Sequence, residues 1–235
     1  MTPTVLLFDV DGTLVNAGGA GKRAMAAAFE AVCQAPEAVE RLDLRGMTDS
    51  AIFRDALRAI GHRSDDGVIA RLAERYLSLL PGEIARADRY EVLPGVPGLL
   101  EALGGRPELV VGLGTGNLER GARIKLEHGR IDHHFAFGGF GSDHEAREEI
   151  LRIGAERGAA RLGVPLARCR VVVIGDTPRD VEAGLRIGGE VVGVGTGGYP
   201  PQKLIELGAT YAFQDLSAPG VAAALGGWWR ACSLR

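Results

Sequence analysis

The sequence has 235 residues, of which 46% are hydrophobic and 24% charged, and its formal net charge is -3. This composition excludes the disordered and fibrous classes, and the scattered basic residues predict no nucleic-acid partner. The three cysteines lie far apart with no C-x-x-C spacing, which argues against a disulfide framework or a zinc site.

The N-terminus carries one short apolar run, residues 5–8, before Asp9 interrupts it. This run is too short for the core of a signal peptide or for a membrane span. We therefore expect a cytoplasmic protein that has no membrane partner.

Apolar runs of this kind recur along the chain, each ending at a Gly-rich or acidic turn, with helix-like stretches between them. They predict buried strands of a parallel sheet at residues 5–8, 109–113, 171–174 and 191–194. A weaker aromatic run at 135–140 predicts a strand nearer one edge. The fold class is therefore α/β, with a Rossmann-like, mostly parallel sheet as its core.

The stretch between the first two predicted strands is far longer than the roughly dozen residues that a crossover between parallel strands needs. Residues 20–32, 50–59 and 66–80 in it carry apolar side chains at helical spacing. We predict a helical domain inserted at 16–94, with hinges near 16–21 and 88–95, in a core formed by 1–15 and 95–235.

Acidic residues follow two of the predicted strands. Asp9 and Asp11 end the first, and Asp176 and Asp180 follow the fourth. Because the carboxyl ends of parallel strands meet in one crevice, the four carboxylates are expected to face one pocket. Clustered carboxylates repel one another, and with oxygen ligands alone Mg²⁺ is the predicted cation.

The second predicted strand ends in Thr115, Gly116 and Asn117. A hydroxyl and open backbone amides at this position are typical of groups that bind phosphate oxygens. A turn with a helix N-cap is the alternative for this segment. The Gly-rich stretches at 112–117 and near Gly21 do not match the sequence motifs of dinucleotide-binding or P-loop proteins. Neither class of nucleotide-binding protein is therefore predicted.

The residues at these strand ends are similar to the motifs of a known protein family. The segment 9–13, Thr115, and the segment 175–180 resemble the first, second and fourth motifs of the haloacid dehalogenase superfamily. The predicted insert looks like the helical C1-type cap of its phosphoglycolate-phosphatase-like members. The resemblance extends over nearly the whole chain.

The resemblance implies a magnesium-dependent phosphatase whose partner is a small phosphorylated metabolite, either a phosphoglycolate-like ester or a sugar phosphate. Asp9 would be the nucleophile that forms an aspartyl-phosphate, and Asp11 the general acid and base. Thr115 would hold phosphoryl oxygens. The metal would be held by Asp9, the Asp11 backbone carbonyl and Asp176, with Asp180 binding through water or orienting the site.

The third motif departs from the family pattern, which places a lysine after the third strand. Arg147 is our candidate for this cation, because Ser142 and Glu145 form the pattern of a capping box that begins a helix there. The competitor, Lys125, is expected on the solvated face of an amphipathic helix. In the predicted cap, Arg45 and Thr48 are candidate substrate contacts, against the alternative that such residues only begin a helix.

Two other functions remain open on the sequence. A phosphoglucomutase-like phosphotransferase would share every core residue, and a non-catalytic binding protein could keep the fold. The tail carries Trp228 and Trp229, for which packing is favoured over a dimer contact, and a monomer or homodimer is expected.

Overall fold

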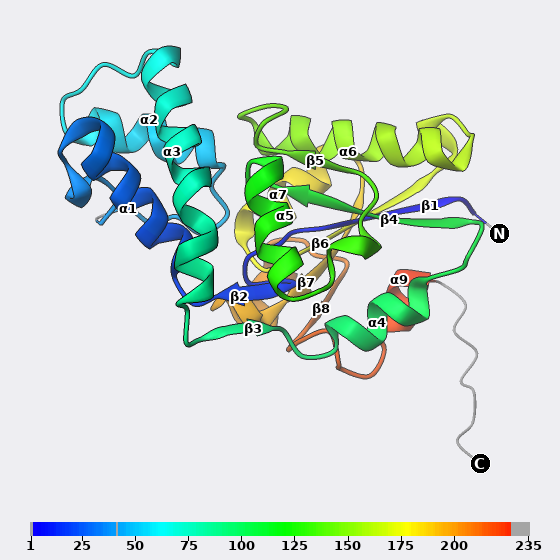
Figure 1. Cartoon of the computed structure of the whole chain (residues 1–235). Helices are drawn as coiled ribbons and strands as arrows, with labels where there is room; N and C mark the ends of the chain where they lie inside the picture. The colour runs from blue at the N-terminus through cyan, green and yellow to red at the C-terminus, as the bar shows by residue number, and fades with distance from the viewer. Residues whose placement is uncertain (1, 41, 227–235) are drawn as a thin grey trace.

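The computed structural model describes residues 2–40 and 42–226, and its centre is a sheet of six parallel strands (Figure 1). Their spatial order is β5-β4-β1-β6-β7-β8. In chain order they are β1 (Thr4–Phe8), β4 (Leu109–Thr115), β5 (Gly138–Phe140), β6 (Arg170–Gly175), β7 (Glu190–Val194) and β8 (Tyr211–Phe213). The α/β class and the predicted strands are confirmed, with β5 at an edge as expected. Strand β8 was not predicted.

Strand β1 lies at the middle of the sheet, and all five of its residues are buried. Val5 and Leu7 point into one apolar cluster, whereas Leu6 and Phe8 point into another. A strand covered on both faces has no polar side to show, which explains why its sequence is a continuous apolar run.

Helices cover both faces of the sheet. On the Leu6 side lie α4 (Val96–Leu103), α5 (Glu119–His128) and α9 (Val221–Gly226). On the Val5 side lie α6 (Arg147–Leu162), α7 (Pro178–Arg186) and α8 (Pro201–Glu206). Short 3-10 helices lie in connecting segments, at η2 (Asp132–His134), η3 (Leu166–Arg168) and η4 (Gly195–Gly197).

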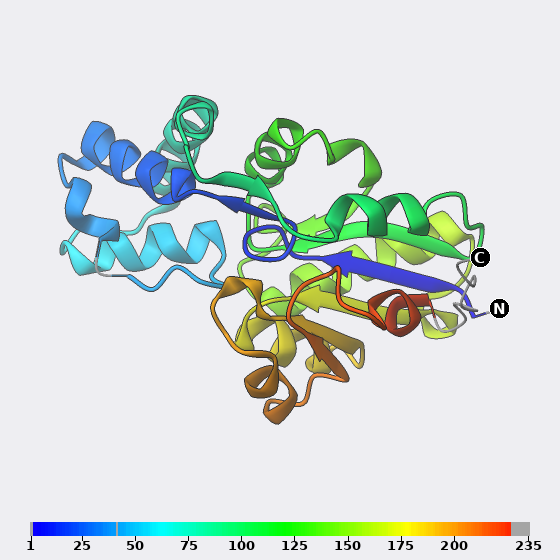
Figure 2. The same ribbon diagram turned by 90° about the horizontal axis from the view of Figure 1, so that it is seen from below.

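The stretch between β1 and β4 folds into helices with an apolar cluster of their own, which we call the helical insert. It comprises α1 (Ala20–Cys33), η1 (Pro36–Val39), α2 (Asp49–Ala59) and α3 (Asp66–Ala85). The three predicted helices are found, and α3 continues past Pro81 because Ile84 is still buried in the cluster. The insert lies beyond the carboxyl ends of the strands (Figures 1 and 2).

The two segments that link the insert to the sheet pair with each other. Strands β2 (Val15–Ala17) and β3 (Tyr90–Val92) form an antiparallel ribbon. These are the segments in which the sequence predicted hinges. Both linkers therefore leave the sheet side by side.

No helix within residues 2–40 and 42–226 is long and apolar enough to cross a membrane. Trp228 and Trp229, the tail residues singled out in the sequence, lie outside the described residues.

Candidate active site

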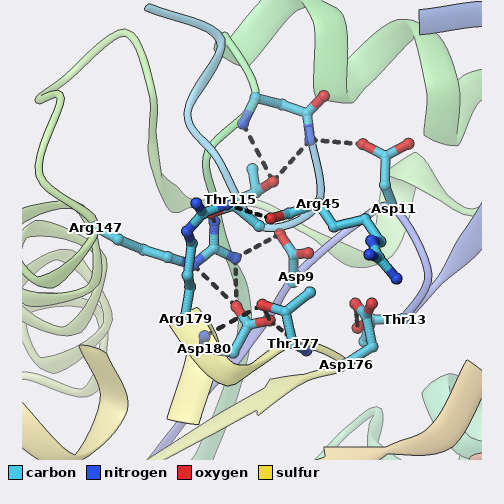
Figure 3. A network of polar contacts seen from close by, with 12 residues as sticks. Asp9, Asp11, Thr13, Arg45, Thr115, Arg147, Asp176, Thr177, Arg179 and Asp180 are labelled. Carbon is cyan, nitrogen blue, oxygen red and sulfur yellow. Dashed lines mark hydrogen bonds and ion pairs between the residues drawn. The ribbon is translucent and has the colours of Figure 1, made fainter. Parts of the chain in front are cut away.

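The loops after β1, β4 and β6 meet the helical insert around a cavity of about 530 Å³. From the sheet side, the cavity is lined by Asp9, Asp11, Gly116, Asn117, Arg147 and Asp176, among others. From the insert it is lined by side chains of α1, α2 and α3 and of the segment before α2. Figure 3 shows the polar groups converging from these separate elements.

Asp9, Asp176 and Asp180 form a buried acidic cluster, in which one carboxylate oxygen of each lies within 4.8 Å of the others. Burial raises the pKa of Asp9 to about 6, although Arg147 opposes the shift. Burial and the neighbouring Asp180 and Asp9 raise the pKa of Asp176 well above its ordinary value. A bound cation would relieve this repulsion.

Arg147 is the first residue of α6, and its guanidinium lies between two members of the acidic cluster. Nε donates to Asp180 Oδ1 at 2.9 Å, and Nη2 lies 3.0 Å from Asp9 Oδ1. Burial lowers the pKa of Arg147, but the two carboxylates outweigh it and raise the pKa above its usual value. The structure thus brings the predicted arginine to the cluster.

The capping box predicted to place Arg147 is not formed, and that prediction was wrong. The N-cap of α6 is Ala146, which makes no side-chain capping bond. Ser142 Oγ instead accepts from the Glu119 amide at 3.3 Å, and Glu145 pairs with Arg54 of the insert at 2.9 Å. Both side chains contact other elements.

A capping box does occur at the start of α7, between Thr177 and Asp180. Asp180 Oδ2 accepts from the Thr177 amide at 3.0 Å and from its hydroxyl at 2.6 Å, while Oδ1 faces Arg147. Both oxygens of Asp180 therefore have protein partners. The sequence had left open whether Asp180 binds a metal or orients the site, and these contacts favour orientation.

Asp176 lies in a cradle made by two glycines. Its Oδ1 accepts from the Thr13 hydroxyl at 2.9 Å. A Cβ atom at Gly12 would lie 2.6 Å from Asp176 Oδ2, and one at Gly197 would lie 1.6 Å from it. No other residue type fits at these positions without moving the carboxylate.

Asp11 has a half-exposed side chain, 44% accessible, and points away from the acidic cluster into the cavity. Asn117 Nδ2 donates to Asp11 Oδ2 at 2.9 Å and to Thr115 Oγ1 at 2.8 Å. The fully buried Thr115 in turn donates a hydrogen bond that lowers the pKa of Asp9. A chain of polar contacts thus joins Asp11 to Asp9.

Lys125 belongs to the same network, and the prediction of a solvated face was wrong for it. The side chain is buried, and Nζ donates to Asp11 Oδ2 at 2.5 Å and to Asn117 Oδ1 at 2.6 Å. Helix α5 presents Lys125 toward the insert rather than toward solvent, because α5 packs against α3. Arg147 and Lys125 are therefore both at the site.

The first residue of α2 and the segment before it lie against the strand loops. The Asp49 amide donates to the Gly116 carbonyl at 2.8 Å, and Arg147 Nη1 donates to the Gly46 carbonyl at 3.5 Å. A Cβ atom at Gly116 would lie 2.5 Å from the Met47 carbonyl oxygen. Gly116 thus permits close approach of the insert.

Arg45 and Thr48, the two predicted substrate contacts of the insert, lie in different places. Arg45 lines the cavity, but its guanidinium pairs with Asp43 through two hydrogen bonds of 2.9 Å and stacks on Tyr199. Thr48 is the N-cap of α2, accepts from the Ala51 amide at 3.2 Å and does not line the cavity.

Thr48→Ala should therefore act on stability. We expect a loss of about 1 kcal/mol in the free energy of unfolding, measured by urea denaturation, because a buried N-cap bond is removed. Thr48→Ser, which keeps the hydroxyl, should restore most of it. A raised KM with unchanged stability in Thr48→Ala would instead support a substrate contact.

Two residues at the site, Asp49 and Tyr76, were not predicted from the sequence. Asp49 is buried at the start of α2, and burial raises its pKa to about 6. Tyr76 continues the apolar series of Val68, Leu72 and Leu80 along α3, so its spacing indicates only a core position.

Solved structures with this fold are numerous. A hydrolase from Pseudomonas syringae is 24% identical, with a TM-score of 0.65 over 94% of this chain and 96% of that one. A predicted phosphoglycolate phosphatase from Haemophilus somnus is 18% identical, with a TM-score of 0.66 over 92% and 95%. CbbY from Rhodobacter sphaeroides, in complex with phosphate, is 19% identical, with a TM-score of 0.66 over 96% and 99%. At these identities the likeness shows the fold.

A search of curated proteins found no significant match. The sequence model of the haloacid dehalogenase-like hydrolases matches residues 3–188, which cover β1, the helical insert and the strand loops described above. The resemblance noted in the sequence is thus confirmed, and the chain belongs to the haloacid dehalogenase-like hydrolases.

Proposed function

We propose that this protein is a magnesium-dependent phosphatase that hydrolyses phosphate monoesters of small cytoplasmic metabolites through an aspartyl-phosphate on Asp9. One observation carries the proposal. A buried carboxylate, Asp9, contacts the Arg147 guanidinium and lies in a cluster with two further carboxylates, and a second, accessible carboxylate, Asp11, lines the same cavity.

The acidic cluster fits Mg²⁺. The donors are carboxylate oxygens, the pKa of both Asp9 and Asp176 is raised by burial, and Gly12 and Gly197 leave room for the Asp176 carboxylate beside Asp9. Asp9 and Asp176 would hold the ion, together with the Asp11 carbonyl that the family pattern implies. Bound there, it would neutralise charge on the phosphoryl oxygens.

Two carboxylates carry out the reaction: Asp9 forms and breaks the bond to phosphorus, and Asp11 transfers protons. An Asp9 oxygen forms a bond to phosphorus while the bond to the ester oxygen breaks, and that oxygen takes a proton from Asp11. Water then gives a proton to Asp11 and attacks phosphorus, and the Asp9 bond breaks to release inorganic phosphate. Lys125 and Asn117 hold Asp11 in position throughout.

Release of inorganic phosphate from a panel of phosphate monoesters, with Mg²⁺ and with a chelator, tests this proposal. We expect turnover that requires Mg²⁺. Transfer of the phosphoryl group to an added sugar, with little free phosphate, would instead identify a phosphotransferase. Absence of both, under conditions in which the protein is folded, would favour a binding protein.

Gly197→Ala should weaken metal activation. The added Cβ would overlap Asp176 Oδ2, so the carboxylate must move. We expect the Mg²⁺ concentration for half-maximal activity to rise about tenfold or more, as when a group that positions a metal ligand is altered. Gly98→Ala on α4, where a Cβ meets no atom within 4 Å, is the matched control and should behave as wild type. Equal metal dependence in both variants would exclude Asp176 as a ligand.

A further inference from the structure

Tyr76 carries the one buried side-chain polar atom that lacks a hydrogen-bond partner among residues 2–40 and 42–226. The residue is fully buried on α3, between Leu72 and Leu80, yet it also lines the cavity above Asp9 and Asp11. A hydroxyl without a partner is costly inside a protein, and phenylalanine would fill the same apolar position without that cost. The hydroxyl therefore calls for a partner outside the chain.

The groups around this hydroxyl belong to the candidate active site. Gly21 of α1 is close to both Tyr76 and Lys125, because a Cβ there would be 3.9 Å from the Tyr76 hydroxyl and 3.7 Å from Lys125 Nζ. Lys125 uses two of its three N–H donors, on Asp11 and Asn117, which leaves the third for a ligand. The missing side chain at Gly21 leaves the space beside both groups free.

Asp49 adds an acceptor to these donors. Asp49 lines the same cavity, its Oδ2 accepts from the Leu118 amide at 2.8 Å, and its charge acts on both Tyr76 and Lys125. Burial, together with Asp49 and Asp11, raises the pKa of Tyr76 well above its ordinary value, so the phenol keeps its proton and can donate. We call Tyr76, Lys125, Asp49 and Gly21 the Tyr76 corner.

We propose that the Tyr76 corner binds a hydroxyl group of the substrate's leaving group, so that the enzyme prefers phosphate esters of polyols or sugars over phosphorylated carboxylic acids. A hydroxyl can accept from Tyr76 or Lys125 and donate to Asp49, whereas a carboxylate only accepts. Asp11 already compensates the charge of Lys125, and Asp49 would repel a second anion. This inference rests on the proposed phosphatase activity.

The corner also lies where the leaving group must be. Lys125 Nζ contacts Asp11, which we assign as the acid that protonates the ester oxygen. A hydroxyl on the carbon chain attached to that oxygen would therefore meet the Tyr76 corner, while the phosphoryl group remains near Asp9.

Three matched esters test the inference: glycerol phosphate, propyl phosphate without hydroxyls, and phosphoglycerate, in which a carboxylate replaces the terminal hydroxymethyl group. We expect kcat/KM to be highest for glycerol phosphate. In Tyr76→Phe the preference for glycerol phosphate over propyl phosphate should fall about five- to tenfold, the worth of one neutral hydrogen bond. The melting temperature should stay the same or rise, because the phenol makes no bond within the protein.

Two further variants complete the test. Gly21→Ala places a methyl group in the corner at ordinary contact distances and should reduce the same preference. Tyr211→Phe, at an exposed tyrosine of β8, is the matched control and should leave it unchanged. An unchanged preference in Tyr76→Phe, or a wild-type preference for phosphoglycerate, would overturn the inference while leaving the phosphatase proposal intact. If the wild type hydrolyses no ester, the proposed function itself fails and the inference fails with it.

Discussion

Asp9→Asn should abolish magnesium-dependent phosphate release, with kcat falling on the order of 10⁴-fold or more, as expected when a covalent nucleophile is removed. The amide has nearly the same shape as the carboxylate and can still contact Arg147 and Thr115. It cannot form the aspartyl-phosphate. The variant should therefore keep the circular dichroism spectrum of the wild type while losing turnover on every ester.

Asp55→Asn is the matched control, because Asp55 lies in α2 of the insert, pairs only with Arg58 at the surface and does not line the cavity. It should keep wild-type kcat and KM. Phosphorylated Asp9 can be sought directly by stopping wild-type turnover with acid and measuring the peptide mass. Full activity in Asp9→Asn would disprove the covalent route.

Arg147→Met should lower both stability and activity strongly. The substitution leaves Asp9 and Asp180 buried without the cation that lies between them, and breaking a buried ion pair in this way costs about 3–5 kcal/mol. Urea denaturation without metal would measure this loss. Phosphate release should fall too, because the guanidinium lies where it can contact a phosphoryl group bound to Asp9.

Arg147→Lys separates charge from shape. Lysine keeps the charge but cannot contact Asp180 through two nitrogens while also reaching Asp9, so we expect partial recovery of stability and of kcat. Arg152→Met is the control in the same helix, since Arg152 makes only surface pairs with Glu149 and Glu156 and should cause little change. Wild-type stability in Arg147→Met would contradict the ion-pair assignment.

The central strands were predictable because both of their faces are buried, so their sequences are continuous apolar runs. The same reasoning could not find β8, whose residues Tyr211–Phe213 are partly exposed at the sheet edge. It also missed β2 and β3, which are three residues each and are specified by pairing with one another. Short strands of this kind leave little pattern in the sequence from which they could be predicted.

The acidic residues of the site were predictable because the ends of parallel strands converge, and Asp9, Asp176 and Asp180 do so. Lys125 was misjudged because helical spacing reports only which side of a helix a residue occupies. Its burial depends on Asp11, 114 positions away in the sequence. Helical spacing could not identify Tyr76 either. A tyrosine in an apolar series has the pattern of any core residue, and only the structure shows where its hydroxyl lies.

The insert is joined to the core through two linkers, β2 and β3, which pair with each other in one ribbon. On the side of Arg45, Asp49 and Arg54, by contrast, the insert meets the core through hydrogen bonds and an exposed ion pair. These contacts, and the packing of α3 against α5, would have to separate for the insert to move, whereas the pairing of the two linkers would not. The exchange of substrate and product with solvent would then be a rotation about the ribbon, and its rate would increase with ionic strength as salt screens the Arg54–Glu145 pair.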